Sequence, residues 1–304
     1  MRKFAEHWLS VLQKTLHIWL EAQSFMHAAA LAFFTLFSVA PVVIVAVTIV
    51  GLALGEEAAR GQIAQQLQAA IGTEAAQAVQ TAVAASRIER SGILPSLAGL
   101  AAMLFGATTV FAQMQTALNA IWGVTPRPTR SSLFLYVKTR LLSLTVVLAI
   151  GFVLLVSLLL SVVVRALVVF AQAWLPVPPA LLLGVDAVVS VGVVSLLFAT
   201  IFRVLPDVIL SWRDVWLGAL VTALLFGLGR SLIALYLSTT ATASTYGAAA
   251  SLVLLLMWVN YSSLILLFGA AFTRANVQAR GQSVRPRVTA IRIHRQLVED
   301  EPRA

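Results

Sequence analysis

The sequence predicts an all-α integral membrane protein with six transmembrane helices, an amphipathic N-terminal helix and a helical outer loop. Three observations predict this fold class. Of the 304 residues, 60% are hydrophobic and 11% are charged, whereas a soluble domain carries about 25% charged residues. The chain also contains long apolar runs, and its basic residues gather between alternate runs. Together these features exclude an ordinary soluble domain.

The apolar runs have the length that crosses a bilayer. A hydrocarbon core of about 30 Å is spanned by about 20 helical residues, which satisfy their own backbone polar groups. Six such runs occur, at Ala28–Leu54, Ile93–Trp122, Leu141–Val164, Ala180–Phe202, Val215–Leu237 and Gly247–Thr273. We therefore predict a six-span membrane domain over residues 28–273.

The segments outside the spans also show helical patterns. In residues 1–27 the apolar side chains that fall near one helix face are Phe4, Trp8, Leu12, Leu16, Trp19 and Leu20. This pattern predicts a helix lying in the cytoplasmic interface. The segment lacks the features of a signal peptide, so we expect the first span to remain in the mature chain. The outer loop 56–92 carries Ile63, Leu67 and Ile71 at helical spacing, which predicts short helices outside the membrane.

The distribution of basic residues predicts the orientation. Sixteen of the 21 Lys and Arg residues fall in the N-terminal segment, the second and fourth loops and the C-terminal tail. Basic loops face the cytoplasm, so both termini are expected there. The same topology explains the net charge of +9, so we expect no nucleic acid partner. The basic tail 274–304 is expected to be mobile or bound to the membrane surface. The expected lipid head-group contacts are Arg127, Arg130, Arg140 and Arg274.

Arg230 is the most unusual residue, because it stands inside an otherwise apolar run. A charged side chain near the bilayer centre costs about 2.5–3.5 kcal/mol and should face the bundle interior or water. Asp186 lies at a similar predicted depth on the preceding span, which suggests an ion pair. Three interpretations stay open: Arg230 binds an anionic head group in a cavity, snorkels to the outer interface, or forms a structural salt bridge.

Further candidates for a substrate cavity are polar or helix-bending residues within the spans. Pro41 removes a backbone donor and predicts a kink beside Ser38. Asn119 and Asn260 are expected to hydrogen-bond between helices, and Tyr246 to anchor at the interface or pack. Small residues spaced by four predict close helix packing. These pairs are Gly218 and Thr222, Ala219 and Ala223, Gly227 and Ser231, and Gly247 and Ser251.

Catalysis is not expected. Cysteine is absent, and the 12 acidic residues are scattered, whereas metal-dependent cleavage needs clustered carboxylates or histidines. On the cytoplasmic side only Asp207 and Asp214 lie near the spans, and no histidine joins them. The stretch "GLGRS" lacks the length and lysine of a nucleotide-binding loop. We expect no enzyme, no metal and no cofactor.

Several stretches carry a resemblance to a known family. They are "AAALAFFTLFSVAPVVIVAVTIVG" at 28–51, "LNAIWGV" at 118–124, "RVLPDVILSWRDVWLGALVTALLFGLGRSLIALYL" at 203–237 and "STYGAAASLVLLLMWVNYSSLILLFGAAFTRA" at 244–275. In order and spacing the chain resembles the YihY/BrkB family of bacterial inner-membrane proteins, from about residue 10 to 280. One departure is Ala271, where the family usually has an acidic residue.

The resemblance implies a six-span inner-membrane protein. The family once bore a ribonuclease label, includes a serum-resistance factor and has been linked to moving or handling envelope lipids. We therefore expect a transporter-like protein that moves or exports an envelope lipid or other anionic amphiphile through a polar cavity. The alternative is a non-transporting membrane protein that organises envelope assembly through protein partners.

Overall fold

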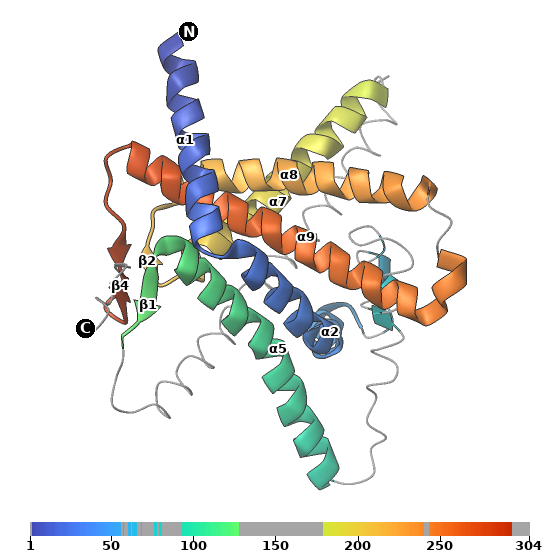
Figure 1. Cartoon of the computed structure of the whole chain (residues 1–304). Helices are drawn as coiled ribbons and strands as arrows, with labels where there is room; N and C mark the ends of the chain where they lie inside the picture. Colours follow the sequence, from blue (N-terminus) through green and yellow to red (C-terminus); the bar gives the residue numbers. More distant parts are fainter. Residues whose placement is uncertain are drawn as a thin grey trace, which may run out of the picture.

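Long helices make up most of the part of the chain that the structure describes (Figure 1). The computed structural model describes residues 2–55, 93–127, 179–239 and 243–293, with scattered positions between 57 and 80. The elements are α1 (Arg2–Glu21), α2 (Ser24–Leu54), α5 (Ile93–Trp122), β1 (Val124–Pro126), α7 (Pro179–Val204), β2 (Val208–Ile209), α8 (Trp212–Thr239), α9 (Ala243–Ala279), β3 (Arg285–Pro286) and β4 (Ala290–Arg292).

The helices α2, α5, α7, α8 and α9 coincide with predicted spans one, two, four, five and six. Among the described residues, two stretches are long and apolar enough to cross a membrane, Trp212–Leu232 in α8 and Leu255–Ala279 in α9. A third candidate is the bent pair Glu6–Glu21 and Ser24–Ser38, whose parts meet at 60°. The third predicted span, 141–164, lies outside the described residues. The helical class is confirmed, and the count of six spans stays a prediction.

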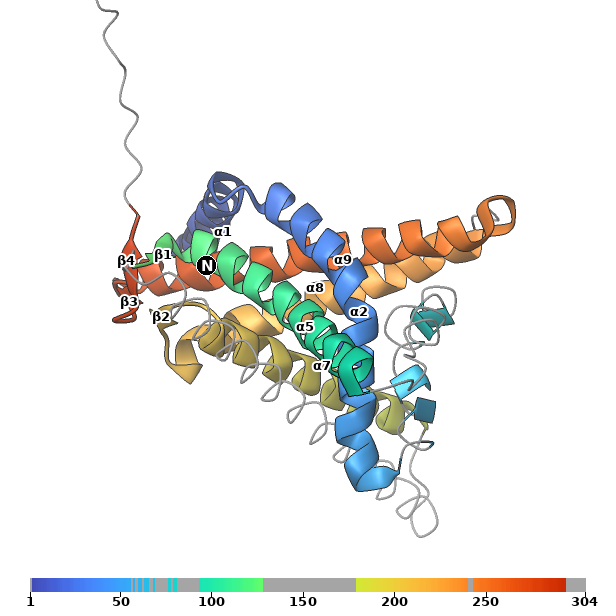
Figure 2. The ribbon, with the colours of Figure 1, turned by 90° about the horizontal axis from the view of Figure 1, so that it is seen from below.

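α8 and α9 run side by side (Figures 1 and 2) because glycines of each helix lie against threonines of the other. A Cβ added to Gly218 would overlap the Thr273 hydroxyl, and one added to Gly269 would overlap the Thr222 hydroxyl. Each hydroxyl donates to a carbonyl of its own helix, Thr222 to Gly218 at 2.6 Å and Thr273 to Gly269 at 2.8 Å. Absence of side chains at the glycines therefore sets the distance between the two helices.

The predicted packing of small residues is confirmed only in part. On α8, both predicted pairs that lie next to each other are buried, namely Gly218 with Thr222 and Ala219 with Ala223. Gly227 and Ser231 are exposed, and no atom of the described residues lies within 4 Å of a Cβ added to Gly227. The prediction was wrong there, because spacing by four marks a face of the helix but not which face meets a neighbour. The burial of Gly247 and Ser251 lies outside what the structure describes.

α1 lies across α9 near one end of the long helices (Figure 1). The Trp8 ring stacks on Phe272, with ring centroids 6.2 Å apart. The Trp19 indole N–H donates to the Leu264 carbonyl at 3.3 Å. These contacts fix the direction of α1, since its two tryptophans meet α9 more than two turns apart.

α1 has three faces rather than the single apolar face predicted. Its buried residues include Val11, Thr15 and Ile18. A second face consists of exposed leucines, Leu9, Leu12, Leu16 and Leu20. The third face is polar and exposed and consists of Glu6, His7, Ser10, Gln13, Lys14, His17 and Glu21. A helix with one face on the protein and a separate exposed leucine face suits the plane of a membrane surface.

The break between α1 and α2 falls at Gln23, which has a positive φ of 53°. A left-handed residue commonly ends a helix. The break comes earlier than the predicted boundary after residue 27, and α2 then continues as one helix past Pro41. Most of the predicted outer loop 56–92 lies outside the described residues; of the positions described there, Ala76 and Val79 are buried.

The chain beyond α9 folds back on the segments that follow α5 and α7. α9 continues to Ala279, past its predicted end. β4 then pairs antiparallel with β1, and β3 with β2. The tail is expected to be mobile or bound to the membrane surface, and mobility is wrong for residues 285–292, because their strands satisfy backbone groups of two loops that would otherwise lack partners. Binding of the tail to the membrane surface stays a prediction. Sequence charge reports solubility and carries no information on such pairing.

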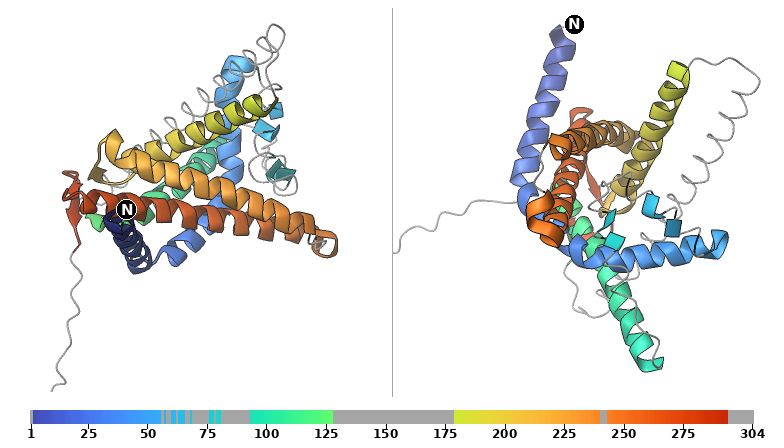
Figure 3. Two further views of the ribbon diagram at one scale, coloured as in Figure 1. Left: turned by 90° about the horizontal axis from the view of Figure 1, so that it is seen from above. Right: turned by 90° about the vertical axis from the view of Figure 1, so that its right-hand side faces the viewer.

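The buried core lies at this strand end of the molecule. Its fully or almost fully buried members include Ala117, Leu118, Ile121, Trp122, Ala199, Phe202, Val208, Val215, Ala219, Leu267 and Ala270. The views in Figures 2 and 3 show α5, α7, α8 and α9 diverging from this end. The best-packed part of the described chain is therefore where the loops, the tail and α1 meet.

Candidate functional site

A buried carboxylate lies at the strand end, between α5 and the turn that follows α7. Asp207 is 7% exposed, and its Oδ2 accepts hydrogen bonds from Asn119 Nδ2 at 2.8 Å and Gln115 Nε2 at 3.3 Å. The Asp207 N–H donates in return to Asn119 Oδ1 at 2.8 Å. Both amides come from one face of α5, because residues four apart lie above one another on a helix. This reciprocal pairing ties α5 to the end of α7.

The turn that carries Asp207 is held by the tail. The Arg287 guanidinium donates to the carbonyls of Arg203 and Val204 at 3.3 and 3.2 Å. The Arg287 N–H donates to the Asp207 carbonyl at 2.9 Å. The last carbonyls of a helix have no partner within it, so one arginine satisfies the end of α7 and the turn together.

Arg274 performs the corresponding role at the end of α5. Its Nη1 donates to the Ile121 carbonyl at 2.6 Å. The guanidinium passes close to Gly123, where an added Cβ would lie 3.4 Å from it and where φ is +65°. Gly123 thus serves as a left-handed helix end and leaves room for the arginine. Arg274 Nε is buried and has no hydrogen-bond partner among the described residues.

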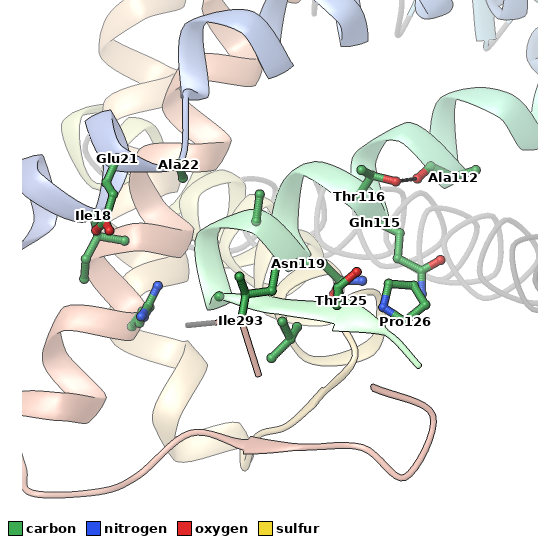
Figure 4. A pocket seen from close by; sticks show the side chains of 14 residues that line it. Ile18, Glu21, Ala22, Ala112, Gln115, Thr116, Asn119, Thr125, Pro126 and Ile293 are labelled. Atoms are coloured by element: carbon green, nitrogen blue, oxygen red, sulfur yellow. Dashed lines mark hydrogen bonds between the residues drawn. The ribbon is translucent and has the colours of Figure 1, made fainter. Parts of the chain in front are cut away.

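A hollow of about 350 Å³ opens beside these groups, between α1, α5, β1 and α9 (Figure 4). Its polar lining comprises Glu21, Gln115, Thr116, Asn119, Thr125 and Arg274, and the rest of the lining is apolar or glycine. Figure 4 shows Glu21 on one side of the hollow, with Gln115, Asn119 and Thr125 on the other. The hollow can therefore offer hydrogen-bond donors and acceptors as well as both signs of charge.

The residues predicted for a substrate cavity do not gather in one place. Asn119 lines the hollow and hydrogen-bonds Asp207 in the turn after α7 rather than a neighbouring helix. Ser38 is buried in α2 and Asn260 is half-buried in α9. Pro41 and Tyr246 belong to α2 and α9, but their side chains lie outside the described part.

Arg230 is exposed on α8, beside the exposed Leu228 and Leu232. The hollow at the strand end does not include it. The side chain of Asp186 lies outside the described residues, so the suggested pair of Arg230 with Asp186 stays a prediction.

The four arginines expected to contact lipid head groups also do not gather in one place among the described residues. Arg274 lines the hollow. Arg127 is exposed, and its N–H donates to the Thr289 carbonyl at 2.8 Å. Arg130 and Arg140 lie outside the described residues.

Sequence reasoning missed Asp207, Gln115 and Glu21 as parts of a site. In the sequence Asp207 stands out only as a possible metal ligand, and it has no neighbouring histidine. Two signals were available: amide side chains at 115 and 119 on one face of an apolar helix, and Pro206–Asp207 in the short loop after a predicted span. In the described ranges no three His, Asp or Glu side chains gather as metal ligands.

The site brings together three stretches that are far apart in the chain. "LNAIWGV" supplies Asn119 and Gly123, "RVLPDV" supplies Asp207, and "AFTRA" supplies Arg274. Such a helical chain, with candidate spans and a polar site at one end of its helices, is a membrane protein of the helical class.

Comparison with known proteins gives the family. The family model described as "Virulence factor BrkB" matches residues 15–290. This chain belongs to the BrkB family of membrane proteins.

Three relatives, each named "UPF0761 membrane protein", illustrate the similarity. Those of Psychromonas ingrahamii and Alteromonas mediterranea are 29% identical over 180 and 181 residues, in each case 59% of this chain and 58% of the relative. That of Verminephrobacter eiseniae is 38% identical over 76 residues, 25% of this chain and 18% of the relative. The chain thus matches less than two thirds of the length of these relatives. No solved structure matches it.

Proposed function

We propose that this protein is a transporter-like protein of the bacterial inner membrane that binds an envelope lipid, or a similar charged amphiphile, by its head group and moves it. The observation that carries the proposal is the polar hollow at the strand end, with Arg274 and fixed amides in its wall. A guanidinium is well suited to phosphate, because it can donate two parallel hydrogen bonds. The proposal includes no catalytic step.

The size of the hollow favours a head group over a whole lipid. Small-molecule sites usually measure about 300–1,000 Å³, and this hollow of about 350 Å³ lies at the lower end. Acyl chains would therefore remain outside it, against apolar surface. Such surface is exposed on the adjacent α1, at Leu12, Leu16 and Leu20.

The arrangement of α1 supports a position of the hollow at head-group depth. α1 lies across α9 (Figure 1), and its exposed leucine face suits insertion just below the head groups. Ile18, Glu21 and Ala22, at the end of α1, line the hollow. We propose that this end is on the cytoplasmic side, because Arg127 follows β1, Arg203 and Arg213 lie in the helix ends that flank β2, and Arg285, Arg287 and Arg292 lie in the paired tail segment. A periplasmic reporter fused after residue 304 should then be inactive, and one inserted at residue 75 should be active.

The test is lipid movement in vesicles that contain purified protein. Fluorescent phospholipids are reduced from outside, and the fraction that becomes accessible with time measures movement across the bilayer. We expect the wild type to speed this movement and Arg274→Gln to abolish the effect, while Arg280→Gln, an exposed arginine of the same helix end, retains it. Arg274→Lys should retain part of the rate.

Two outcomes would overturn the proposal. If the wild type moves no envelope lipid, the protein does not transport lipids, and the organising role through protein partners becomes the better explanation. If Arg230→Gln abolishes movement and Arg274→Gln does not, the head-group site lies on α8 rather than at the strand end.

A further inference from the structure

Charges of opposite sign face the same hollow from different elements. Glu21 comes from the last turn of α1, and Arg274 comes from α9. The Glu21 carboxylate is close enough to attract the Arg274 guanidinium electrostatically. It also lies 3.6 Å from His17 Nδ1, on the same helix. A ligand with a single negative charge would gain from Arg274 and be repelled by Glu21.

The rest of the polar lining is neutral and hydrogen-bonding. The Asn119 amide is fixed by its two bonds to Asp207, and the Gln115 amide nitrogen by a third. The Thr116 hydroxyl donates to the Ala112 carbonyl at 3.0 Å, which leaves its oxygen lone pairs as acceptors. A ligand in the hollow therefore meets charges of both signs together with neutral hydrogen-bonding groups.

From this arrangement we propose that the hollow binds the zwitterionic head group of a phospholipid with a primary ammonium, the phosphodiester against Arg274 and the ammonium against Glu21. This inference rests on the proposed function only in using the same hollow. It adds the substrate class and assigns Glu21 as the residue that determines specificity.

A primary ammonium fits better than a quaternary one. Quaternary ammonium groups have no N–H donors and are recognised by cages of aromatic rings. None of the described residues that line the hollow is aromatic. A primary ammonium has three N–H donors, and the Glu21 carboxylate can accept from them. The chemistry therefore favours an ethanolamine over a choline head group.

The experiment measures equilibrium binding of short-chain lipids to the purified full-length protein by calorimetry. The probes are phosphatidylethanolamine, phosphatidylcholine and phosphatidylglycerol with the same acyl chains, and glycerophosphoethanolamine without acyl chains. We expect phosphatidylethanolamine to bind at least about tenfold more tightly than phosphatidylcholine and phosphatidylglycerol, because a charge-assisted hydrogen bond contributes about as much as a tenfold change in affinity. Glycerophosphoethanolamine should bind more weakly than phosphatidylethanolamine because it lacks the acyl chains.

Substitution of Glu21 separates specificity from folding. Glu21→Gln should weaken phosphatidylethanolamine binding about tenfold and leave phosphatidylglycerol binding unchanged or stronger. Glu21→Lys should reverse the preference. Glu6→Gln makes the same charge change elsewhere on the polar face of α1 and should leave all affinities as in the wild type, and unchanged circular dichroism would show that each variant folds.

Equal binding of the three lipids, or an equal loss of all three in Glu21→Gln, would overturn the inference. Equally tight binding of glycerophosphoethanolamine would show that the ligand is a soluble head group rather than a lipid. Failure here is distinct from failure of the proposed function. If the protein moves lipids without preferring ethanolamine head groups, only the proposed head-group specificity is refuted. If it binds phosphatidylethanolamine selectively but moves no lipid, only the proposed transport is refuted.

Discussion

The close contact between α8 and α9 predicts that adding one methyl group at Gly218 destabilises the protein. Gly218→Ala places a Cβ on the Thr273 hydroxyl and 3.1 Å from the Gly269 carbonyl oxygen. Relief requires Thr273 to rotate, which breaks its hydrogen bond to Gly269, or the helices to separate. Overpacking costs about 1–3 kcal/mol and a lost hydrogen bond about 1 kcal/mol, while alanine returns up to about 1 kcal/mol of helix propensity. We expect a net loss of about 1–3 kcal/mol.

The matched control lies on the same helix. Gly227→Ala makes the same chemical change where nothing lies within 4 Å of the new Cβ, so it should be neutral or stabilising by up to about 1 kcal/mol. The assay is unfolding of the purified protein in detergent, followed by circular dichroism. Thr273→Ala, which removes the overlapping hydroxyl, should recover part of the loss in the double variant. Equal midpoints for Gly218→Ala and Gly227→Ala would refute the close approach of the two helices.

Further predictions follow from the polar junction and from α1. Asn119→Ala should destabilise the protein by about 2–4 kcal/mol in the same assay, because it leaves a buried carboxylate and N–H short of partners; Asp207→Asn, whose carbonyl can accept the same bonds, should lose less. Gly123→Ala should lose about 1–2 kcal/mol because φ is positive there. The chain has no cysteine, so Leu12→Cys and Lys14→Cys each create one labelling site. In membranes a water-soluble maleimide should label position 14 and spare position 12; equal labelling would contradict a leucine face in lipid.

The positions of the long helices could be predicted because hydropathy alone determines them. The second predicted span and α5 share the bounds Ile93–Trp122. α9 exceeds its prediction at both ends, and at its C-terminal end the helix continues through Arg274, Asn276 and Gln278, whose polarity ends the apolar run. Hydropathy reports where lipid ends, whereas a helix ends where its backbone finds other partners.

Only part of the candidate site could be predicted: Asn119 and Arg274 follow from the sequence and line the hollow, whereas Asp207, Gln115 and Glu21 join it through contacts between distant segments. Asn119 and Asp207 are 88 residues apart, and each looks unremarkable in its own stretch. The strands of two or three residues that fix the tail carry no periodic signal. Arg230 is the opposite case. An isolated charge in an apolar run is easily recognised in the sequence, whether or not a hollow lies beside it in the structure.

The joining of helix ends by the tail has a mechanical consequence. At the strand end Asn119 binds Asp207, Arg274 binds the Ile121 carbonyl and Arg287 binds the end of α7. Sliding of α5 against α7 or α9 would break these bonds, so a relative motion of these helices that keeps the bonds intact must be a tilt about this end. In such a tilt the far ends of the diverging helices would move the farthest.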